Sequence, residues 1–411
     1  MARPVRRAAA LTAAAALLLT GCQATDTPAA GVSDVVLTVG ADDTRLSVTW
    51  FTTSDANACV QLASGRAPTT IRGTVTAAAS DPTQRRVRAD LAGLRPATAY
   101  TYRVGDCGSA WTPPVAFTTD ADDTATFAFL GDPHVVEPGP WRTTVQRVVQ
   151  DASPDVLLWA GDILDSADPA EQVPQWDAVL SAPELRSVPL GPTLGNHEGT
   201  AAGYGDHLST PTTTVPADVI ARTVTAPGSG DYWFTHGNTL VVSLNSNSRD
   251  IAAHGAVLAA AAAAHPEARW RVVVFHHAPF SAAGHALEEA TAQLRSELAP
   301  VLSRNRVDLV LNGHDHHYAR SLLIDGNTPV AGSVGPVLHP TPGQTLYVTA
   351  PSATAFKSYP LGDLPGWVAF AEAGVEASYV VVTAGTDELS VSYRRVADGQ
   401  VLDGVALRRV G

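Results

Sequence analysis

Short runs of alternating apolar and polar residues fill the chain from Asp34 to residue 119. The runs are rich in Val, Tyr, Phe and Trp, and turn residues separate them; they read VVLTVG, RLSVTWF, CVQLA, RRVRADL, AYTYRVG and VAFTT. Strands with one buried face alternate in this way. The pattern predicts an all-β sandwich over residues 34–119. The acidic stretch DADDT, Asp120 to Thr124, is interpreted as a hinge behind it.

The pattern changes over residues 125–411. Continuous apolar runs appear, namely TFAFLG, DVLLWAG, VPLGPTLG, TLVVSLNS, RVVVF and VDLVLNG. Helical patterns stand between them, opening at Pro140 and lying near 169–182, 251–264 and 286–304. Strands that are apolar throughout and alternate with helices are typical of a layered α/β domain whose sheets are covered on both faces. Beyond Gly343, the runs TLYVTA, SYVVVTAG and LSVSYRRV are expected to finish a sheet.

The first 33 residues carry a different pattern. A basic head is followed by an apolar stretch from Ala8 to Leu19 and by small residues before Cys22. This is the layout of a secretory signal over residues 1–21, too short to span a bilayer; the alternative is a disordered, Ala-rich start. The ending LTGC resembles the lipobox of bacterial lipoproteins, which implies lipidation of Cys22 and an exported, membrane-anchored protein. Residues 22–33 are expected to be a flexible tether.

Net charge and cysteine content limit the class of binding partner and the redox state of the cysteines. The formal net charge is −13, which would repel phosphate backbones and disfavours a nucleic-acid scaffold protein. A small phosphorylated substrate stays compatible if local cations offset the field. Beyond Cys22 only Cys59 and Cys107 remain. An even pair in an oxidising compartment favours a disulfide, and the alternative is two separate buried thiols.

Five of the strand-like runs end on carboxylate, amide or imidazole side chains. These are Asp132 and His134, Asp162 and Asp165, Asn196 to Glu198, His276 and His277, and His314 and His316. In α/β sheets, ligands gather beyond the carboxyl ends of strands, so we expect these groups to converge on one crevice. Any one histidine alone would more often be a core or surface residue. Five coincident clusters favour a site.

The donor types indicate which ions the site would bind. A mixed oxygen and imidazole set suits Mn, Fe or Zn rather than a thiolate site. There are enough donors for two ions, and a shared carboxylate can bridge a pair about 3.5–4 Å apart. Such pairs stabilise the attacking and leaving oxygens of a phosphoryl displacement. The sequence therefore predicts a binuclear metal centre with phosphoester chemistry.

The successive blocks GDPH, GDILD, GNHE, VVFHHAPF and GHDHH, between Thr126 and about Arg320, resemble those of the calcineurin-like metallophosphoesterases. The segment LAGLRPATAYTYRVG, Leu91 to Gly105, resembles the end of a fibronectin type III-like domain. A sandwich in front of the catalytic blocks makes the whole chain similar to purple acid phosphatases. The resemblance implies an α/β fold, a four-layer β-sandwich flanked by helices, preceded by an all-β fibronectin type III-like sandwich.

The resemblance also assigns metal ligands. Asp162 is expected to bridge two ions. The first ion would be held by Asp132, His134, Asp162 and His316, and the second would be completed by Asn196, His276 and His314. His276 is the expected ligand of the doubled histidine, from its distance to Phe280. Its neighbour His277 is expected to face the sheet.

The remaining polar residues near the blocks receive other roles. By resemblance, His197 meets the leaving group or a phosphate oxygen, and Asp165 orients it, as suits a general acid. His285 either faces the substrate or simply begins the helix HALEEATAQL. The histidines that match no motif are expected at the surface or in packing, and these are His207, His236, His254, His265 and His339.

Two departures from the purple acid phosphatase pattern change the expected metal chemistry. That family reads Gly-Asp-x-Gly in its first block and ends the second with a tyrosine ligand to ferric iron. His134 and Asp165 stand at those places here. The tyrosinate is missing, so neither the purple colour nor a ferric first site is implied. Ser166 stands where protein phosphatases commonly have an arginine, which weakens any interpretation of the chain as a protein phosphatase.

The resulting hypothesis is an exported phosphoric ester hydrolase, an acid phosphatase-like phosphomonoesterase that uses a hydroxide held by two Fe, Mn or Zn ions. Its partners would be a small phosphorylated substrate and, through the lipid anchor, a membrane. One alternative is a phosphodiesterase acting on cyclic nucleotides or cell-envelope phosphodiesters. Another is a surface binding protein in which the sandwich does the work and the enzyme domain is catalytically retired.

Overall fold

The computed structural model describes residues 27–28, 31–65, 67–108, 110–120, 123–211 and 216–409. The expected signal segment 1–21 and the expected lipidation site Cys22 lie outside these residues. Among the described residues, no helix combines the length and apolar character needed to cross a membrane.

The N-terminal domain is a sandwich of two sheets. One sheet contains β1 (Thr27–Pro28), β4 (Cys59–Ala63), β5 (Thr69–Arg72), β8 (Ala99–Gly105), β9 (Ala110–Trp111) and β10 (Val115–Thr118). The other contains β2 (Val32–Val39), β3 (Arg45–Thr52), β6 (Thr74–Ala77) and β7 (Arg85–Ala92). Along β7, Val87, Ala89 and Leu91 are buried while Asp90 and Ala92 are exposed, as period-two alternation predicts. Trp50, Tyr102 and Phe117 fill the core.

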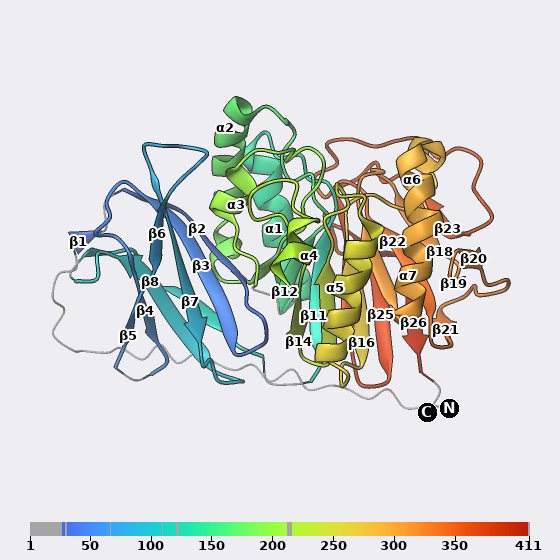
Figure 1. The fold of residues 1–411 in the computed structure, drawn as a ribbon, viewed down its shortest axis with the longest axis horizontal. Helices are drawn as coiled ribbons and strands as arrows, with labels where there is room; N and C mark the ends of the chain where they lie inside the picture. The colour runs from blue at the N-terminus through green and yellow to red at the C-terminus, as the bar shows by residue number, and fades with distance from the viewer. Residues whose placement is uncertain are drawn as a thin grey trace.

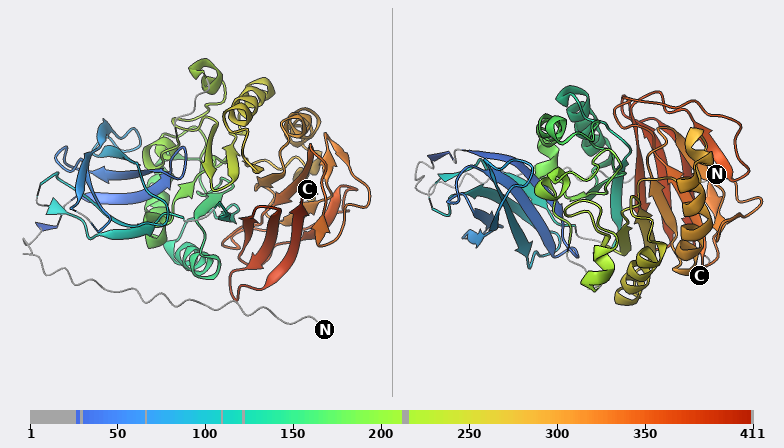
Figure 2. Two further views of the ribbon diagram at one scale, coloured as in Figure 1. Left: turned by 90° about the horizontal axis from the view of Figure 1, so that it is seen from below. Right: turned by 45° about the horizontal axis from the view of Figure 1, so that its top comes forward.

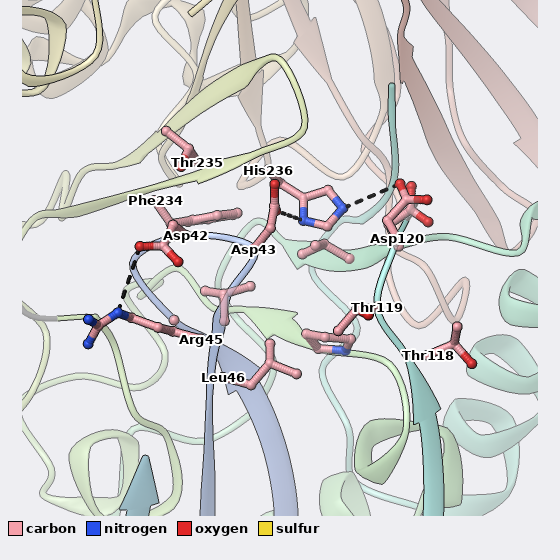
Figure 3. A pocket seen from close by; sticks show the side chains of 15 residues that line it. Asp42, Asp43, Arg45, Leu46, Thr118, Thr119, Asp120, Phe234, Thr235 and His236 are labelled. Atoms are coloured by element: carbon pink, nitrogen blue, oxygen red, sulfur yellow. Dashed lines mark ion pairs between the residues drawn. The ribbon is translucent and has the colours of Figure 1, made fainter. Parts of the chain in front are cut away.

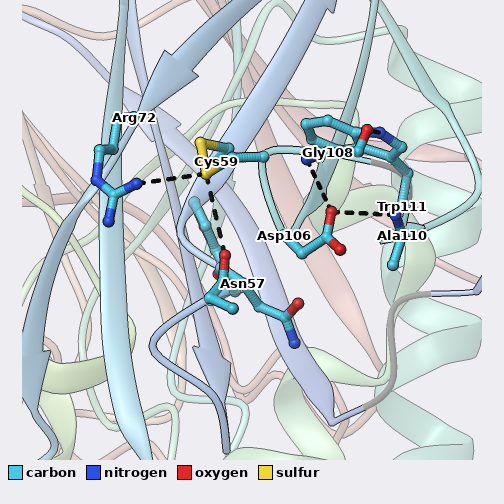
Figure 4. Close-up of a disulfide and its surroundings, with 10 residues drawn as sticks. Asn57, Cys59, Arg72, Asp106, Gly108, Ala110 and Trp111 are labelled. Atoms are coloured by element: carbon cyan, nitrogen blue, oxygen red, sulfur yellow. Dashed lines mark hydrogen bonds between the residues drawn. A yellow bond between two sulfur atoms is a disulfide. The ribbon is translucent and has the colours of Figure 1, made fainter.

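A disulfide joins Cys59 to Cys107 in this sandwich (Figure 4). The pairing follows from strand register: Cys59 stands opposite Gly105 on β8, so Cys107 begins the turn just beyond. Asp106 holds that turn, because its Oδ1 accepts hydrogen bonds from the backbone N–H groups of Gly108 and Ala110 at 2.8 and 3.0 Å.

Two sheets face each other in the C-terminal domain. The first contains β11 (Ala125–Leu130), β12 (Val156–Trp159), β13 (Leu190–Gly191), β21 (Val337–Leu338), β24 (Ser378–Ala384), β25 (Glu388–Arg395) and β26 (Val401–Arg408). The second contains β14 (Tyr232–His236), β15 (Thr239–Ser243), β16 (Trp270–Val274), β17 (Leu309–Asn312), β18 (Tyr318–Ser321), β19 (Ile324–Asp325), β20 (Thr328–Pro329), β22 (Gln344–Thr349) and β23 (Val368–Glu372). Strands β11–β12–β13 and β15–β16–β17–β22 run parallel.

Helices cover the outer faces and complete four layers (Figure 1). They are α1 (Pro138–Ala152), α2 (Pro169–Leu180), α3 (Gly203–His207), α4 (Ala217–Ala221), α5 (Ile251–Ala264), α6 (Glu289–Gln293) and α7 (Ala299–Arg304), with short turns η1 (Pro183–Arg186), η2 (Gly284–Leu287) and the π-helical η3 (Leu294–Leu298). Strand β11 shows why its residues are apolar throughout: Phe127 and Phe129 enter the core between the sheets, while Ala128 and Leu130 face α1.

The two domains share a sheet. Strand β2 of the sandwich pairs in parallel with β13 through Thr38 and Leu190, so the combined sheet has eleven strands. His207 lies where the two domains meet. Its ring stacks on the ring of Trp176 with 4.6 Å between ring centroids, and the ring of Phe51 on β3 packs against it in a T-shaped arrangement. The sandwich therefore lies at one end of the molecule, continuous with the C-terminal domain (Figure 2).

The structure corrects one sequence expectation about the last strands. The three runs beyond Gly343 do not finish a single sheet: β22 joins the second sheet, whereas β24 and β25 join the first. The apolar pattern identifies a strand but carries no information on its partner, because backbone hydrogen bonds decide the pairing.

Candidate metal centre

The expected metal ligands lie together at one edge of the two sheets. Each follows the carboxyl end of a parallel strand: Asp132 and His134 follow β11, Asp162 follows β12, Asn196 follows β13, His276 follows β16, and His314 and His316 follow β17. Because these ends face the same way, loops far apart in sequence meet in one crevice.

The loops that carry the ligands have unusual backbone conformations. Positive φ angles of 29°, 46°, 48°, 71° and 51° occur at Asp132, His134, Asp162, His314 and His316. A left-handed conformation at a residue other than glycine costs ~1–3 kcal/mol and persists where surrounding structure imposes it. Such strain at five donors is typical of a functional site.

Two glycines allow the loops to approach each other. A Cβ on Gly195 would lie 2.2 Å from Asp162 Oδ1, and one on Gly313 would lie 2.4 Å from Asp132 Oδ2. Any side chain at these positions would displace a carboxylate. The glycines of the GNHE and GHDHH blocks thus serve close packing around the donors.

The first half of the centre gathers Asp132, His134 and His316, whose donor atoms lie within 4.8 Å of one another. His134 Nε2 faces His316 Nε2 at 3.1 Å. Asp132 is fully buried, and both its oxygens accept the backbone N–H of His314 at 2.9 Å. These groups could hold one ion.

The second half centres on His276. Its Nδ1 donates to the carbonyl of Ala160 at 2.9 Å, which directs Nε2 at the crevice. Nε2 lies 2.9 Å from Asn196 Oδ1, 3.1 Å from His314 Nδ1 and 3.2 Å from Asp162 Oδ2. Donors around a tetrahedral ion have similar spacing, so this set fits a second cation.

Asp162 lies between the two halves. Its Oδ2 is 3.2 Å from His276 Nε2 and 4.0 Å from His134 Nε2, and its side chain is 2% exposed. The backbone N–H of His197 donates to the other oxygen at 2.8 Å. Among the described residues, Asp162 therefore has an oxygen that approaches donor atoms of both halves.

Burial sets the charge of the imidazoles. It lowers the pKa of His134 to about 4, of His316 to about 3 and of His314 to about 2. These three rings are therefore neutral at neutral pH and have lone pairs to offer. Burial alone would also lower the pKa of His276, but Asp162 and Asp132 outweigh it and raise this pKa to about 9. The carboxylates thus favour positive charge at the centre.

Glu198 ends the GNHE block, and its role is visible only in the structure. Its buried carboxylate accepts the backbone N–H groups of Gly195 at 2.6 Å, Asp162 at 3.1 Å and Leu164 at 3.2 Å. Burial and the charge of Asp162 raise the pKa of Glu198 to about 7. Glu198 therefore fastens the loop after β12 to the loop after β13.

Asp165 contacts His197 differently from the expectation. The backbone carbonyl of Asp165, rather than its carboxylate, accepts from His197 Nδ1. The carboxylate lies 3.3 Å from His134 Nδ1 instead. The His197 side chain is 28% exposed and borders the first half, with its ring 4.6 Å from that of His134. The carbonyl fixes the ring and leaves Nε2 facing the crevice.

The structure also places the two histidines with open roles. His277 does not turn into the sheet: its ring lies 4.5 Å from that of His314, and its Nδ1 lies 2.8 Å from Ser246 Oγ. His285 lies on η2, with its ring 4.3 Å from that of His314 and its Nδ1 2.6 Å from Glu288 Oε1. Both rings thus face the second half of the centre.

The segment after β22 borders the centre as well, and no sequence motif marked it. Phe356 stacks on His134 with 5.6 Å between ring centres. The Lys357 carbonyl lies 3.3 Å from His316 Nδ1, and the Tyr359 ring is 5.0 Å from the His316 ring. The only signal in the sequence was that Lys357 is its single lysine.

Comparisons with known proteins agree with this architecture. The family model of the calcineurin-like phosphoesterases matches residues 125–318, and that of the purple acid phosphatase N-terminal domain matches residues 32–119. The solved structure of a purple acid phosphatase from yellow lupin (Lupinus luteus) seeds has a TM-score of 0.74 at 17% identity. The matched residues make up 92% of this chain and 74% of the lupin protein's chain, so the two proteins share a fold.

Sequence relatives match shorter or more distant stretches. Purple acid phosphatase 17 of Arabidopsis thaliana is 50% identical over 50 residues, 12% of this chain and only 14% of that protein's length. An uncharacterized protein of Mycobacterium tuberculosis is 26% identical over 342 residues. The match covers 71% of this chain and 61% of that protein's length. The chain therefore combines a calcineurin-like metallophosphoesterase domain with an N-terminal domain of the purple acid phosphatase type.

Proposed function

We propose that the protein is an exported phosphomonoesterase with two metal ions in its catalytic centre. The observation that carries the proposal is Asp162, a buried carboxylate between two sets of donors. Support also comes from the metal dependence of the phosphoesterase family that matches the catalytic domain. Two bound ions would supply Lewis-acid activation of water and would neutralise charge on phosphate oxygens.

The protein side chains would fix the ions and move one proton. Asp132, His134 and His316 would hold the first ion, and Asn196, His276 and His314 the second, with Asp162 common to both. His197 would protonate the leaving oxygen, because its Nδ1 is tied to the Asp165 carbonyl and its Nε2 is left for substrate. Asp165 would act through that carbonyl as a positioning residue, and its carboxylate would orient His134.

His285 would meet a phosphate oxygen at the rim of the second half. Its bond to Glu288 Oε1 fixes the ring beside His314 and favours a proton on Nδ1. The His285 side chain is 23% exposed, so its ring can contact an anionic substrate.

The test compares metal content and turnover in the purified full chain. We expect two ions per chain and hydrolysis of an aryl phosphate monoester faster than that of the matching diester. A faster diester reaction would favour the phosphodiesterase alternative, on cyclic nucleotides or envelope polymers. A chain that binds no metal and hydrolyses neither ester would instead support the retired binding protein.

The export proposal has separate support in the N-terminal sequence. The basic, apolar leader ends in LTGC, which resembles a lipobox, so Cys22 would become the lipidated first residue of an anchored protein. The Cys59–Cys107 disulfide suits an oxidising compartment.

A further inference from the structure

A second cluster of metal-binding side chains lies far from the candidate metal centre, where the two domains meet. It lines a cavity of about 180 Å³ between the end of β2, the segment Thr118–Asp120 and the start of β12. Asp155 directly precedes β12, whereas Asp162 follows it. The two sites therefore lie at opposite ends of the same strand, up to roughly 20 Å apart at the rise of an extended chain.

His236 is oriented in this cavity by one carboxylate (Figure 3). Its Nδ1 lies 2.7 Å from Asp43 Oδ1, and the backbone N–H of Gly237 donates to the other oxygen of Asp43 at 3.0 Å. Asp43 accepts a hydrogen bond from Nδ1–H, so in the neutral ring the lone pair is on Nε2. A carboxylate bound behind a histidine in this way is the usual support of a metal-ligating imidazole.

The opposite nitrogen of His236 faces two more carboxylates. Nε2 is buried, and among the described residues it has no hydrogen-bond partner. Asp120 Oδ2 lies 3.9 Å from it, and the donor atoms of Asp120, Asp155 and His236 are all within 4.8 Å of one another. Asp155 is held in place, because its Oδ2 accepts the backbone N–H of Thr126 at 2.7 Å.

This geometry favours positive charge between the groups. Two carboxylates that face a nitrogen lone pair stabilise either a metal ion or a proton on that nitrogen. The 3.9 Å separation is too long for a hydrogen bond. It allows both atoms to lie about 2.0–2.2 Å from one ion, the bond lengths of zinc to imidazole and carboxylate.

We propose that His236, Asp120 and Asp155 bind a divalent cation, zinc or manganese, with Asp43 orienting the histidine. An imidazole beside carboxylates favours these ions over calcium or magnesium. Asp43 belongs to the sandwich, Asp120 to the segment between the domains, and Asp155 and His236 to the catalytic domain. The ion would therefore join the two domains and have a structural role. This site does not depend on the proposed function.

The competing occupant is a proton. Burial alone would lower the pKa of His236, but the hydrogen bond to Asp43 and the charges of Asp43, Asp155 and Asp120 outweigh it and raise this pKa. An imidazolium ion would satisfy the same charges without any metal. The experiment must therefore count ions rather than measure stability alone.

The test measures metal per chain by mass spectrometry in the purified full-length protein and its variants. We expect His236→Gln and Asp120→Asn each to hold one ion fewer than the wild type, with phosphatase turnover unchanged. His265→Gln is the matched control, because His265 also pairs with a carboxylate, Glu267 at 3.4 Å, but does not line the cavity. It should keep the wild-type count.

The outcomes are separable. If His236→Gln fails to fold, Asp120→Asn gives the same reading, since its side chain is 27% exposed and tolerates an isosteric change. A wild-type ion count in folded Asp120→Asn protein would overturn the proposal and leave a proton on His236. The difference of one ion is independent of the catalytic centre, so a failure of the proposed function, detected with Asp162→Asn, would not mimic it.

Discussion

At the residue scale, Asp162 and His197 contact each other and yet are expected to do different work. We predict that Asp162→Asn loses activity together with bound metal, because this carboxylate serves both halves of the centre. His197→Ala should keep its metal and lose roughly 10²–10⁴-fold in turnover, as is common when a general acid is removed. Metal content and turnover measured on the same samples check both expectations.

The leaving group supplies a control for His197. Substrates with good leaving groups need less protonation, so His197→Ala should slow them less than poor ones. Equal losses for all leaving groups, or metal loss as complete as in Asp162→Asn, would show that His197 acts as a ligand.

Glu198 gives a second prediction at this scale. Three backbone N–H groups donate to its carboxylate, and an amide can accept with one oxygen only. Glu198→Gln should therefore lower the free energy of unfolding by about 1–3 kcal/mol and weaken metal retention. Denaturant unfolding and metal content measure the two effects. Glu267→Gln, at a side chain 72% exposed, is the control and should change neither.

The visible spectrum tests the departure at Asp165. A carboxylate stands where purple acid phosphatases carry a tyrosine, so we predict that the iron-loaded protein lacks a strong visible charge-transfer band. The protein should still be active with manganese, zinc or mixed iron loading. A strong band that disappears in Tyr359→Phe would instead identify Tyr359, beside His316, as an iron ligand.

At the element scale, a buried ion pair fastens α5 to the segment before β14. His254 Nδ1 donates to Asp231 Oδ2 at 2.6 Å, its Nε2 donates to the Ser248 carbonyl at 3.2 Å, and neither His254 nor Asp231 exposes its side chain. Burial alone would lower the pKa of His254, but the hydrogen bond to Asp231 and its charge outweigh it and raise this pKa above 6.5.

The pair should make stability depend on pH in a defined direction. A histidine with a raised pKa in the folded state stabilises fully below the unfolded pKa and loses its contribution as pH rises through the folded value. We therefore expect the free energy of unfolding of the wild type, relative to His254→Gln, to fall as pH rises above 6.5. Denaturant titrations at a series of pH values check this, and a difference constant with pH would contradict it.

Individual elements were largely predictable from local pattern. The helix expected at 251–264 is α5 with those bounds, because Asp250 accepts the Ala253 N–H at its start and Ala253, Val257 and Ala261 form one buried face. The stretch near 286–304 is instead divided among η2, α6, η3 and α7. Its apolar residues Leu294, Leu298 and Leu302 keep one face buried through the π-helical turn, so periodicity alone did not reveal the division.

At the scale of the whole molecule, the anchor can be tested directly. We predict that Cys22→Ser moves the protein from the membrane fraction to the soluble fraction, because the LTGC block would no longer be lipidated. Stable anchoring needs more than one acyl chain, so loss of the modified cysteine should release the protein completely. Cell fractionation with immunodetection measures the change. Retention in the membrane fraction would count against lipidation.

The sequence by itself predicted most element types, the order of the domains and the candidate donor residues, because strand and helix periodicity and the polar strand ends are local features of the chain. Only the tertiary structure decided what those donors meet. The sheet shared through Thr38 and Leu190, the clamp formed by Glu198, the carbonyl of Asp165 behind His197 and the His236 cluster all join residues distant in sequence or depend on backbone atoms. Side-chain pattern records burial, whereas strand pairing and loop contacts are chosen by backbone hydrogen bonds and packing among distant segments.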